Sequence, residues 1–298
     1  MIEPIKVSRE DFPKSDITSD GMITLNISCD NETMEYIPDI EYINRDGISL
    51  FIQLILPSER TKDTPLVIYI PGSAFHWQNV KGVIPTISLL VNRGFAVAMV
   101  QYRGSEAASF PAQMLDAKAA VRYMKINAHK YGLNSNKVYL MGDSSGGHTA
   151  LMAGLTVGID GFEEAVYSEV SSDVKGIIDM YGPTDITKMN DELSSQNHIE
   201  PDSPEGCLIG GRNVLEHPEL TAPTVVMNYI DSSREIPPIL IFHGTNDELV
   251  PFGQSCMLYE KLMKCNKNAM FYAIDNAHHG GREFWSSQVL NIIEEFIK

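Results

Sequence analysis

Two adjacent serines flanked by glycines stand out in YLMGDSSGGHTALMAG, residues 139–154. Gly142 and Gly146 make Ser144 the centre of a G-x-S-x-G pattern, between an apolar run that predicts a strand and a segment that predicts a helix. Such a turn exposes the serine at a helix N-terminus, where free N–H groups favour the negative charge that develops during acyl transfer. The pattern predicts that Ser144 is a nucleophile. The alternative is a flexible connection that does no chemistry; a phosphate-binding loop would need a following Gly-Lys-Ser/Thr, which is absent.

A serine hydroxyl needs a base to take its proton, and the base needs an acid that orients it. Both residue types follow later apolar runs. Asp247 comes soon after PPILIFHG at 237–244, and His279 comes soon after AMFYAI at 269–274. The order Ser, Asp, His is the one expected when the serine lies on a strand–turn–helix of this kind. We therefore predict Asp247 and His279 as partners of Ser144.

Each partner has a rival close by. Asp185, in YGPTD, also follows an apolar run, although Pro-Thr-Asp is typical of a turn or a helix cap. His278 stands directly before His279, which is favoured because two glycines follow it. Among the other histidines, His243 ends a predicted strand and is assigned a structural role. None has the spacing of metal ligands, so the sequence predicts neither a metal site nor a cofactor.

The elements that must position these residues alternate along the chain. Strands are predicted at 21–28, 35–43 and 48–56, joined by short links. From residue 65 onward, apolar runs typical of buried strands alternate with helical patterns. The strands are expected at 65–70, 95–102, 137–141, 174–181, 237–244 and 269–274, and the helices at 83–94, 112–131, 145–157, 253–265 and 283–297. This alternation predicts an α/β fold with a mostly parallel sheet, helices on both faces and an antiparallel N-terminal edge.

Residues 184–236 interrupt this alternation. The segment is rich in Pro, Asn and Ser, and its acidic side chains outnumber Lys188, Arg212 and Arg234. It is long for a loop in a compact domain, so it is either a surface excursion or a small cap over the site. We expect residues 1–298 to form a single domain that carries this segment as an insertion.

The net charge and the cysteines indicate which binding partners and which cellular compartment to expect. The formal net charge of −16 disfavours nucleic acid and anionic membrane surfaces as partners. The first residues, MIEPIKVSREDFPKSD, contain no apolar run typical of a secretion signal, although a trimmed signal peptide would leave the same sequence. The four cysteines, Cys29, Cys207, Cys256 and Cys265, lack C-x-x-C spacing and fit reduced thiols, so we expect a cytoplasmic protein.

From about residue 48 the chain resembles α/β-hydrolase esterases of the hormone-sensitive-lipase-like and acetylxylan/feruloyl-esterase-like group. Several ordered motifs carry the resemblance: IYIPGSAFHW, QYRGSEAASFPAQMLDAKAAVRYM, YLMGDSSGGH, MYGPTD, IFHGTNDELVP and NAHHGGREFW. In that group the serine of G-D-S-A-G-G is the nucleophile, the aspartate precedes Val-Pro by a short link, and the histidine precedes glycine. The resemblance thus implies the roles already assigned to Ser144, Asp247 and His279.

One motif departs from the group. Many relatives have His-Gly-Gly-Gly where this chain has Pro71-Gly72-Ser73-Ala74, directly before Phe75. By position, the backbone N–H groups of Ser73 and Ala74, with that of Ser145, are expected to form the oxyanion hole. Glycine adopts backbone angles that serine and alanine resist, so the loop is expected to differ in shape. The alternative is a plain turn after a strand.

Phe75 and Trp77 are predicted to line a substrate pocket beside this loop. Together these features predict a serine carboxylesterase that acts on short, acetyl-type esters, including esters of carbohydrates. The expected partner is a small ester substrate, and the sequence leaves the oligomeric state open. A peptidase or amidase with the same three residues is an alternative because this fold supports both chemistries. A binding protein without activity is the alternative from another class.

Overall fold

The computed structural model describes residues 5–27 and 33–298 of the chain. The chain divides into two units, Met1–Asn31 and Glu32–Lys298, which are described separately. Residues 5–27 of the first unit form neither helix nor strand. The predicted strand at 21–28 is therefore wrong for residues 21–27, while residue 28 and Cys29 lie outside the described residues.

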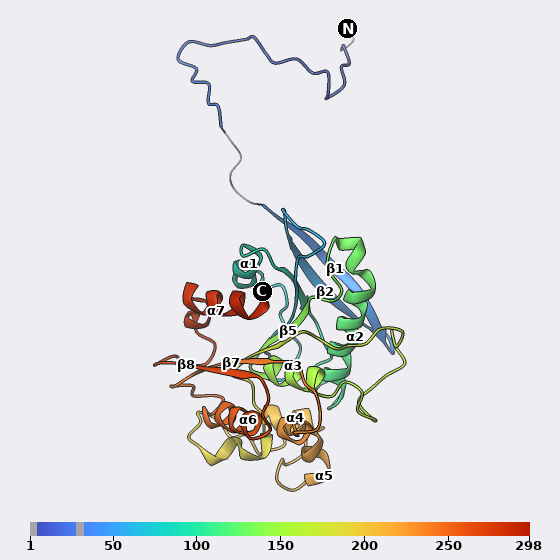
Figure 1. The fold of residues 1–298 in the computed structure, drawn as a ribbon, viewed down its shortest axis with the longest axis vertical. Helices are drawn as coiled ribbons and strands as arrows, with labels where there is room; N and C mark the ends of the chain where they lie inside the picture. The colour runs from blue at the N-terminus through green and yellow to red at the C-terminus, as the bar shows by residue number, and fades with distance from the viewer. Residues whose placement is uncertain (1–4, 28–32) are drawn as a thin grey trace. The chain divides into compact units, whose positions relative to one another are not determined.

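The second unit is built on an eight-stranded sheet in the order β1-β2-β4-β3-β5-β6-β7-β8 (Figure 1). β2 pairs antiparallel with both of its neighbours, and all other pairs are parallel. The predicted mostly parallel sheet with an antiparallel N-terminal edge is thus confirmed. The strands are β1 (Met34–Arg45), β2 (Ile48–Pro57), β3 (Leu66–Ile70), β4 (Ala96–Val100), β5 (Val138–Asp143), β6 (Ile177–Met180), β7 (Ile239–Gly244) and β8 (Ala269–Ile274).

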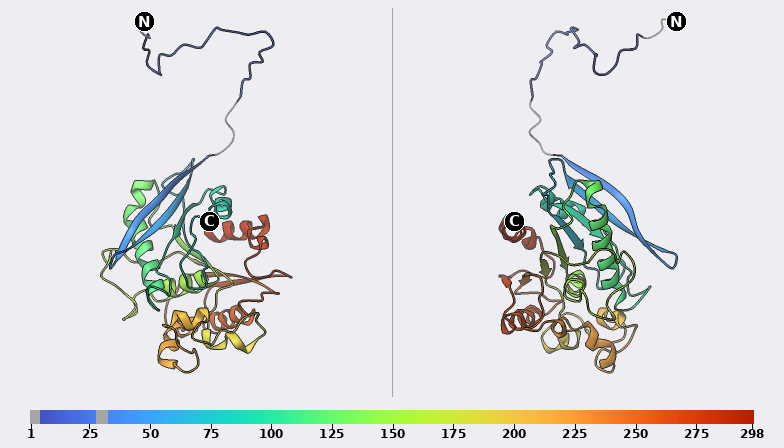
Figure 2. Two further views of the ribbon diagram at one scale, coloured as in Figure 1. Left: turned by 180° about the vertical axis from the view of Figure 1, so that it is seen from behind. Right: turned by 45° about the vertical axis from the view of Figure 1, so that its right-hand side comes forward.

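Helices cover both faces of the sheet and enclose two apolar cores (Figures 1 and 2). Helices α1 (Ile84–Val91) and α7 (Ser287–Ile297) pack on one face. Helices α2 (Ala112–Asn127), α3 (Ser145–Leu155) and α6 (Gly253–Lys264) pack on the other. All residues of β3 and β4 are buried, as expected for apolar strands covered on both faces. No helix in the described parts of the chain has the length and apolarity needed to cross a membrane.

The segment 184–236 joins β6 to β7 and contains only short helices. A small apolar cluster of its own includes Ile186, Ile209 and Val214. The short helices are η2 (Ile186–Asp191), α4 (Pro204–Leu208), α5 (Pro218–Thr221), η3 (Ala222–Thr224) and η4 (Val226–Tyr229); η1 (Ala128–Tyr131) and η5 (Arg282–Trp285) lie elsewhere in the unit. The three described cysteines, Cys207, Cys256 and Cys265, are free thiols.

Candidate active site

The backbone holds Ser144 in an unusual conformation between β5 and α3. Its φ of 52° lies in the left-handed region, and its N–H donates to the carbonyl of Met180 at 2.9 Å. The flanking glycines permit close packing of the backbone here. A Cβ at Gly142 would lie 2.2 Å from the carbonyl oxygen of Gly146, and a Cβ at Gly146 would lie 2.0 Å from that of Ile70. The motif therefore supplies glycine where a side chain would collide with backbone.

The sheet brings Ser144, His279 and Asp247 together at the carboxyl ends of β5, β8 and β7. Ser144 Oγ lies 3.0 Å from His279 Nε2, and His279 Nδ1 lies 2.8 Å from Asp247 Oδ2. An ionised carboxylate only accepts hydrogen bonds, so Nδ1 carries the imidazole proton and Nε2 accepts from the serine hydroxyl. The N–H groups of Leu249 and Val250 donate to Asp247 Oδ1 at 2.9 and 2.8 Å, which fixes the carboxylate.

Asp247 has a second histidine neighbour that sequence analysis treated as structural only. His243 Nε2, at the end of β7, lies 3.3 Å from Asp247 Oδ2, and its Nδ1 lies 2.7 Å from Ser255 Oγ. Burial raises the pKa of Asp247, but hydrogen bonds from His243 and His279 outweigh it and hold that pKa well below its usual range. The carboxylate is thus ionised although its side chain is fully buried. The spacing of four residues between His243 and Asp247 was the available signal.

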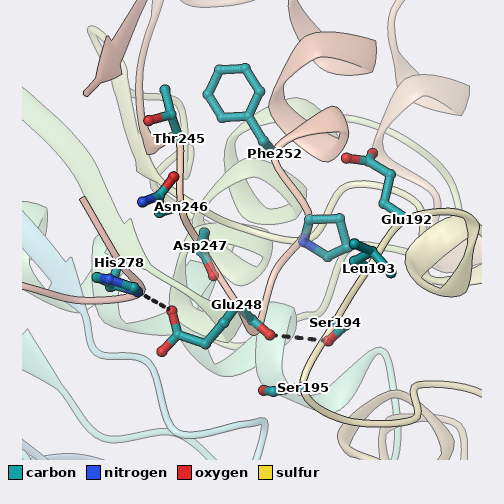
Figure 3. A pocket seen from close by; sticks show the side chains of 11 residues that line it. Glu192, Leu193, Ser194, Ser195, Thr245, Asn246, Asp247, Glu248, Phe252 and His278 are labelled. Atoms are coloured by element: carbon teal, nitrogen blue, oxygen red, sulfur yellow. Dashed lines mark hydrogen bonds and ion pairs between the residues drawn. The ribbon is translucent and has the colours of Figure 1, made fainter. Parts of the chain in front are cut away.

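The two alternative candidates, His278 and Asp185, contact other residues. His278 is 68% exposed, and its Nδ1 lies 3.0 Å from Glu248 Oε2 (Figure 3). Asp185 accepts a hydrogen bond from the N–H of Thr187 at 3.0 Å and caps η2. Neither residue hydrogen-bonds to Ser144 or His279 among the described contacts.

Ser144 and His279 border a cavity of about 310 Å³. Three residues of the segment 184–236 also line it, as does the loop that begins at Gly72. Those three are Gln196, Pro204 and Glu205, and Ser73, Ala74 and Phe75 belong to the loop. The other lining residues are Asp143, Ser145, Pro183, Leu249 and Val250. A second, wider cavity of about 670 Å³ borders Asp247, Glu248 and His278, but neither Ser144 nor His279 lines it (Figure 3).

The loop expected to form the oxyanion hole has an arrangement that the sequence did not predict. The N–H of Ser73 donates to Ser145 Oγ at 2.9 Å, so this donor is already occupied. No described hydrogen bond occupies the N–H groups of Ala74 or Ser145. Ala74, at a position where many relatives have glycine, has a positive φ of 52°, and the next residue, Phe75, has a positive φ of 63°. Ala74 and Ser145 are therefore the available donors.

Of the two aromatic residues predicted to line the substrate pocket, Phe75 lines the cavity and Trp77 does not. Phe75 is buried and borders the cavity with Ser144. Trp77 is 41% exposed and is not among the residues that line this cavity. Within the described residues, no group of three or more His, Cys, Asp or Glu side chains is placed to hold a metal ion.

A family model named BD-FAE matches residues 52–262, well over half of the chain. The chain belongs to the BD-FAE family. This assignment and the fold confirm the resemblance to α/β-hydrolase esterases. A solved structure described as a truncated form of carbohydrate esterase from gut microbiota aligns with a TM-score of 0.80 and 29% identity, over 91% of this chain and 97% of the other.

Curated relatives of this BD-FAE chain include a probable carboxylic ester hydrolase, LipM, of Mycobacterium tuberculosis. It is 27% identical over 220 residues, covering 72% of this chain and 48% of LipM. Isoprenylcysteine alpha-carbonyl methylesterase ICME of Arabidopsis thaliana is 25% identical over 211 residues, covering 68% of this chain and 47% of ICME. The BD-FAE chain thus spans about half the length of these relatives.

Proposed function

We propose that this chain is a serine carboxylesterase in which Ser144 is the nucleophile, His279 the base and Asp247 the residue that orients the base. The observation that carries the proposal is the unbroken hydrogen-bond series from Ser144 Oγ through His279 to Asp247, at 3.0 and 2.8 Å, with the serine in a cavity. The relatives include a probable carboxylic ester hydrolase and an esterase, which supports ester hydrolysis as the reaction.

The reaction proceeds in two halves. Ser144 Oγ attacks the ester carbonyl carbon as its proton moves to His279 Nε2, and the resulting imidazolium is stabilised by ionised Asp247. When the tetrahedral intermediate collapses, the C–O bond to the alcohol breaks and His279 protonates the departing alkoxide. Water then attacks the acyl-enzyme with His279 as base, which releases the acid and restores the serine.

The negative oxygen of each tetrahedral intermediate requires donors that are already in place. We propose the backbone N–H groups of Ala74 and Ser145 for this role, because that of Ser73 donates to Ser145 Oγ. Ser145 lies at the start of α3, where the helix dipole adds a favourable positive potential.

The preferred substrate is a short acyl group, acetyl above all, on a polar alcohol such as a sugar. The cavity of about 310 Å³ lies at the small end of the range for ligand sites. We propose that the segment 184–236 acts as a small cap, because Gln196, Pro204 and Glu205 border the cavity. The carbohydrate esterase among the solved structures supports a sugar ester as substrate.

We expect kcat/KM to fall from p-nitrophenyl acetate to the octanoate and palmitate esters. A single methylene that does not fit costs about 1–3 kcal/mol, so octanoate should react on the order of 10-fold more slowly or worse. Initial rates on the acetate, butyrate, octanoate and palmitate esters measure this directly. A rate that rises toward palmitate would contradict a small acyl site.

Two further measurements separate the alternative functions. Acetate release from acetylated xylo-oligosaccharides tests the sugar ester, and turnover of peptide anilides tests an amidase. Faster cleavage of the anilides than of the esters would favour the amidase. A binding protein without activity would show neither reaction and no acyl-enzyme with an activated ester.

We expect Ser145→Ala to lower kcat by about 5-fold. Ser145 Oγ holds the N–H of Ser73, so its loss removes one hydrogen bond that shapes the loop, worth about 1 kcal/mol, while the backbone N–H of residue 145 remains. The measurement is kcat on p-nitrophenyl acetate. Ser172→Ala is the matched control because Ser172 is also buried and its Oγ has no hydrogen-bond partner among the described residues. A loss as complete as that of Ser144→Ala would reassign the nucleophile.

A further inference from the structure

Glu205 places a carboxylate at the wall of the cavity that contains Ser144. The residue is the second of α4 (Pro204–Leu208) and borders the same cavity as Ser144 and His279. Its side chain is only 4% exposed. A carboxylate this buried is costly unless hydrogen bonds replace the water that it has lost.

Within the described residues, only one of the two carboxylate oxygens of Glu205 has a hydrogen-bond partner. Glu205 Oε2 accepts from His198 Nδ1 at 3.0 Å. No described residue donates to Oε1, and this oxygen is not among the fully enclosed polar atoms that lack a partner. It therefore retains contact with open space, and Glu205 lines the cavity that contains Ser144.

The residues around the cavity leave Glu205 Oε1 free to accept a hydrogen bond from a ligand. No lysine or arginine is among the described residues that line the cavity. An ester group has only acceptor oxygens, so it cannot itself satisfy a carboxylate. A hydroxyl group elsewhere on the substrate can, and hydrogen bonds to charged acceptors are the stronger ones.

A chain of polar contacts holds Glu205 in place. His198 is 1% exposed, and its Nε2 lies 2.8 Å from Ser194 Oγ. Ser194 Oγ in turn lies 3.2 Å from the carbonyl oxygen of Leu249, in the loop whose N–H groups hold Asp247. The carboxylate is thus fixed relative to the loop of the proposed acid. Such preorganisation reduces the cost of ordering a side chain when a ligand binds.

We propose that Glu205 determines specificity by accepting a hydrogen bond from a free hydroxyl on the alcohol part of the substrate, close to the ester that Ser144 attacks. This inference rests on the proposed esterase function and narrows it. The substrate class is an ester of a polyol that keeps an unesterified hydroxyl, as in a partially acylated sugar. A carboxylate on the substrate is disfavoured because it would face Glu205.

The test compares two acetates that differ by one hydroxyl, 2-hydroxyethyl acetate and ethyl acetate. The readout is the ratio of their kcat/KM values in the wild type and in Glu205→Gln. The glutamine keeps the size of the side chain and can still accept from His198 through its oxygen. Its amide NH₂ then replaces Oε1, so an acceptor becomes a donor. We expect the ratio to fall by about 10- to 100-fold, the amount that corresponds to one hydrogen bond to a charged group.

A matched pair in the same segment provides the control. Glu219 Oε1 lies 3.1 Å from His217 Nδ1, but the pair is exposed and lies outside the cavity. Glu219→Gln should leave the ratio unchanged. If Glu205→Gln does not fold, Glu205→Asp keeps the charge but withdraws it from the cavity by one methylene, and the same fall in the ratio is expected.

Four outcomes separate this inference from the proposed function. A selective loss on the hydroxylated ester supports the role of Glu205. An equal loss on both esters, with the ratio unchanged, overturns it and assigns Glu205 to the fold, where an acidic residue in a first helical turn is favourable. A wild type that hydrolyses p-nitrophenyl acetate but shows no preference for the hydroxylated ester also overturns this inference and leaves the esterase intact. A wild type that hydrolyses no ester overturns the proposed function itself.

Discussion

Ser144→Ala is expected to lower kcat on p-nitrophenyl acetate by on the order of 10⁶-fold. The variant removes the atom that we propose attacks the ester carbonyl, and the described hydrogen bonds give Ser144 Oγ a single partner, His279 Nε2. Among the residues that the structure describes, no other hydroxyl hydrogen-bonds to that nitrogen, so none is in place to take over the attack. What remains is the contribution of the oxyanion donors and of substrate binding.

The fold should survive this change. Alanine and serine resist the left-handed φ of 52° to a similar extent, and the backbone bond from Ser144 N to the carbonyl of Met180 stays. Thermal unfolding by circular dichroism measures this, and the melting temperature should shift by only a few degrees (about 1 kcal/mol or less). Incubation with a fluorophosphonate probe should label the wild type and not the variant. A folded variant that keeps most of the wild-type rate would refute Ser144 as nucleophile.

Asp247→Asn is expected to lower kcat by about 10⁴-fold, the loss known when an orienting aspartate becomes an amide. The expected loss follows from the orientation that the new amide at position 247 must adopt. The N–H groups of Leu249 and Val250 bind Oδ1 at 2.9 and 2.8 Å, so the amide oxygen must occupy that position. The NH₂ group then faces His279 Nδ1, which must accept instead of donate.

This change reverses the tautomer of His279. With Nδ1 as acceptor, the neutral imidazole carries its proton on Nε2, the atom 3.0 Å from Ser144 Oγ. A protonated Nε2 cannot take the serine proton, so the nucleophile stays unactivated. His279→Ala removes the base altogether and should be at least as slow. The measurement is kcat on p-nitrophenyl acetate for both variants.

The rival residues supply the controls for this prediction. Asp185→Asn and His278→Ala change the same residue types in neighbouring loops, but neither side chain hydrogen-bonds to Ser144 or His279 in the described contacts. Both controls should keep kcat within about 10-fold of the wild type, since the hydrogen bonds that they change lie outside the proposed triad. An Asp247→Asn enzyme with nearly wild-type kcat, beside a slow Asp185→Asn enzyme, would exchange the two assignments.

The sequence determined the sheet and the position of the serine proposed as nucleophile because both depend on local patterns. Buried parallel strands are continuous apolar runs, and the helices between them show a helical period, so β3 through β8 and the helices that cover them were predicted within a few residues. The turn at Ser144 was equally visible. Gly142 and Gly146 are needed by backbone contacts that recur wherever this turn forms.

Local sequence patterns gave wrong or missing predictions where the conformation depends on residues that are distant in the sequence. Residues 23–27 alternate apolar and polar side chains, yet residues 21–27 form no strand, because alternation alone does not supply the partner that a strand needs for its backbone hydrogen bonds. Likewise, no local pattern shows that the N–H of Ser73 would be occupied by the hydroxyl of Ser145, 72 positions away in the chain.

Only the tertiary structure decided which of two neighbouring candidates meets Ser144. His278 and His279 have the same chemistry, but the loop after β8 aims one at the serine and leaves the other 68% exposed. His198 and Glu205 lie in the segment whose irregular sequence has no period to mark its buried side. Both are buried, and Ser194, which contacts His198, also contacts the carbonyl of Leu249 in the loop of Asp247. The wall of the cavity is therefore a property of the fold and not of any local stretch of sequence.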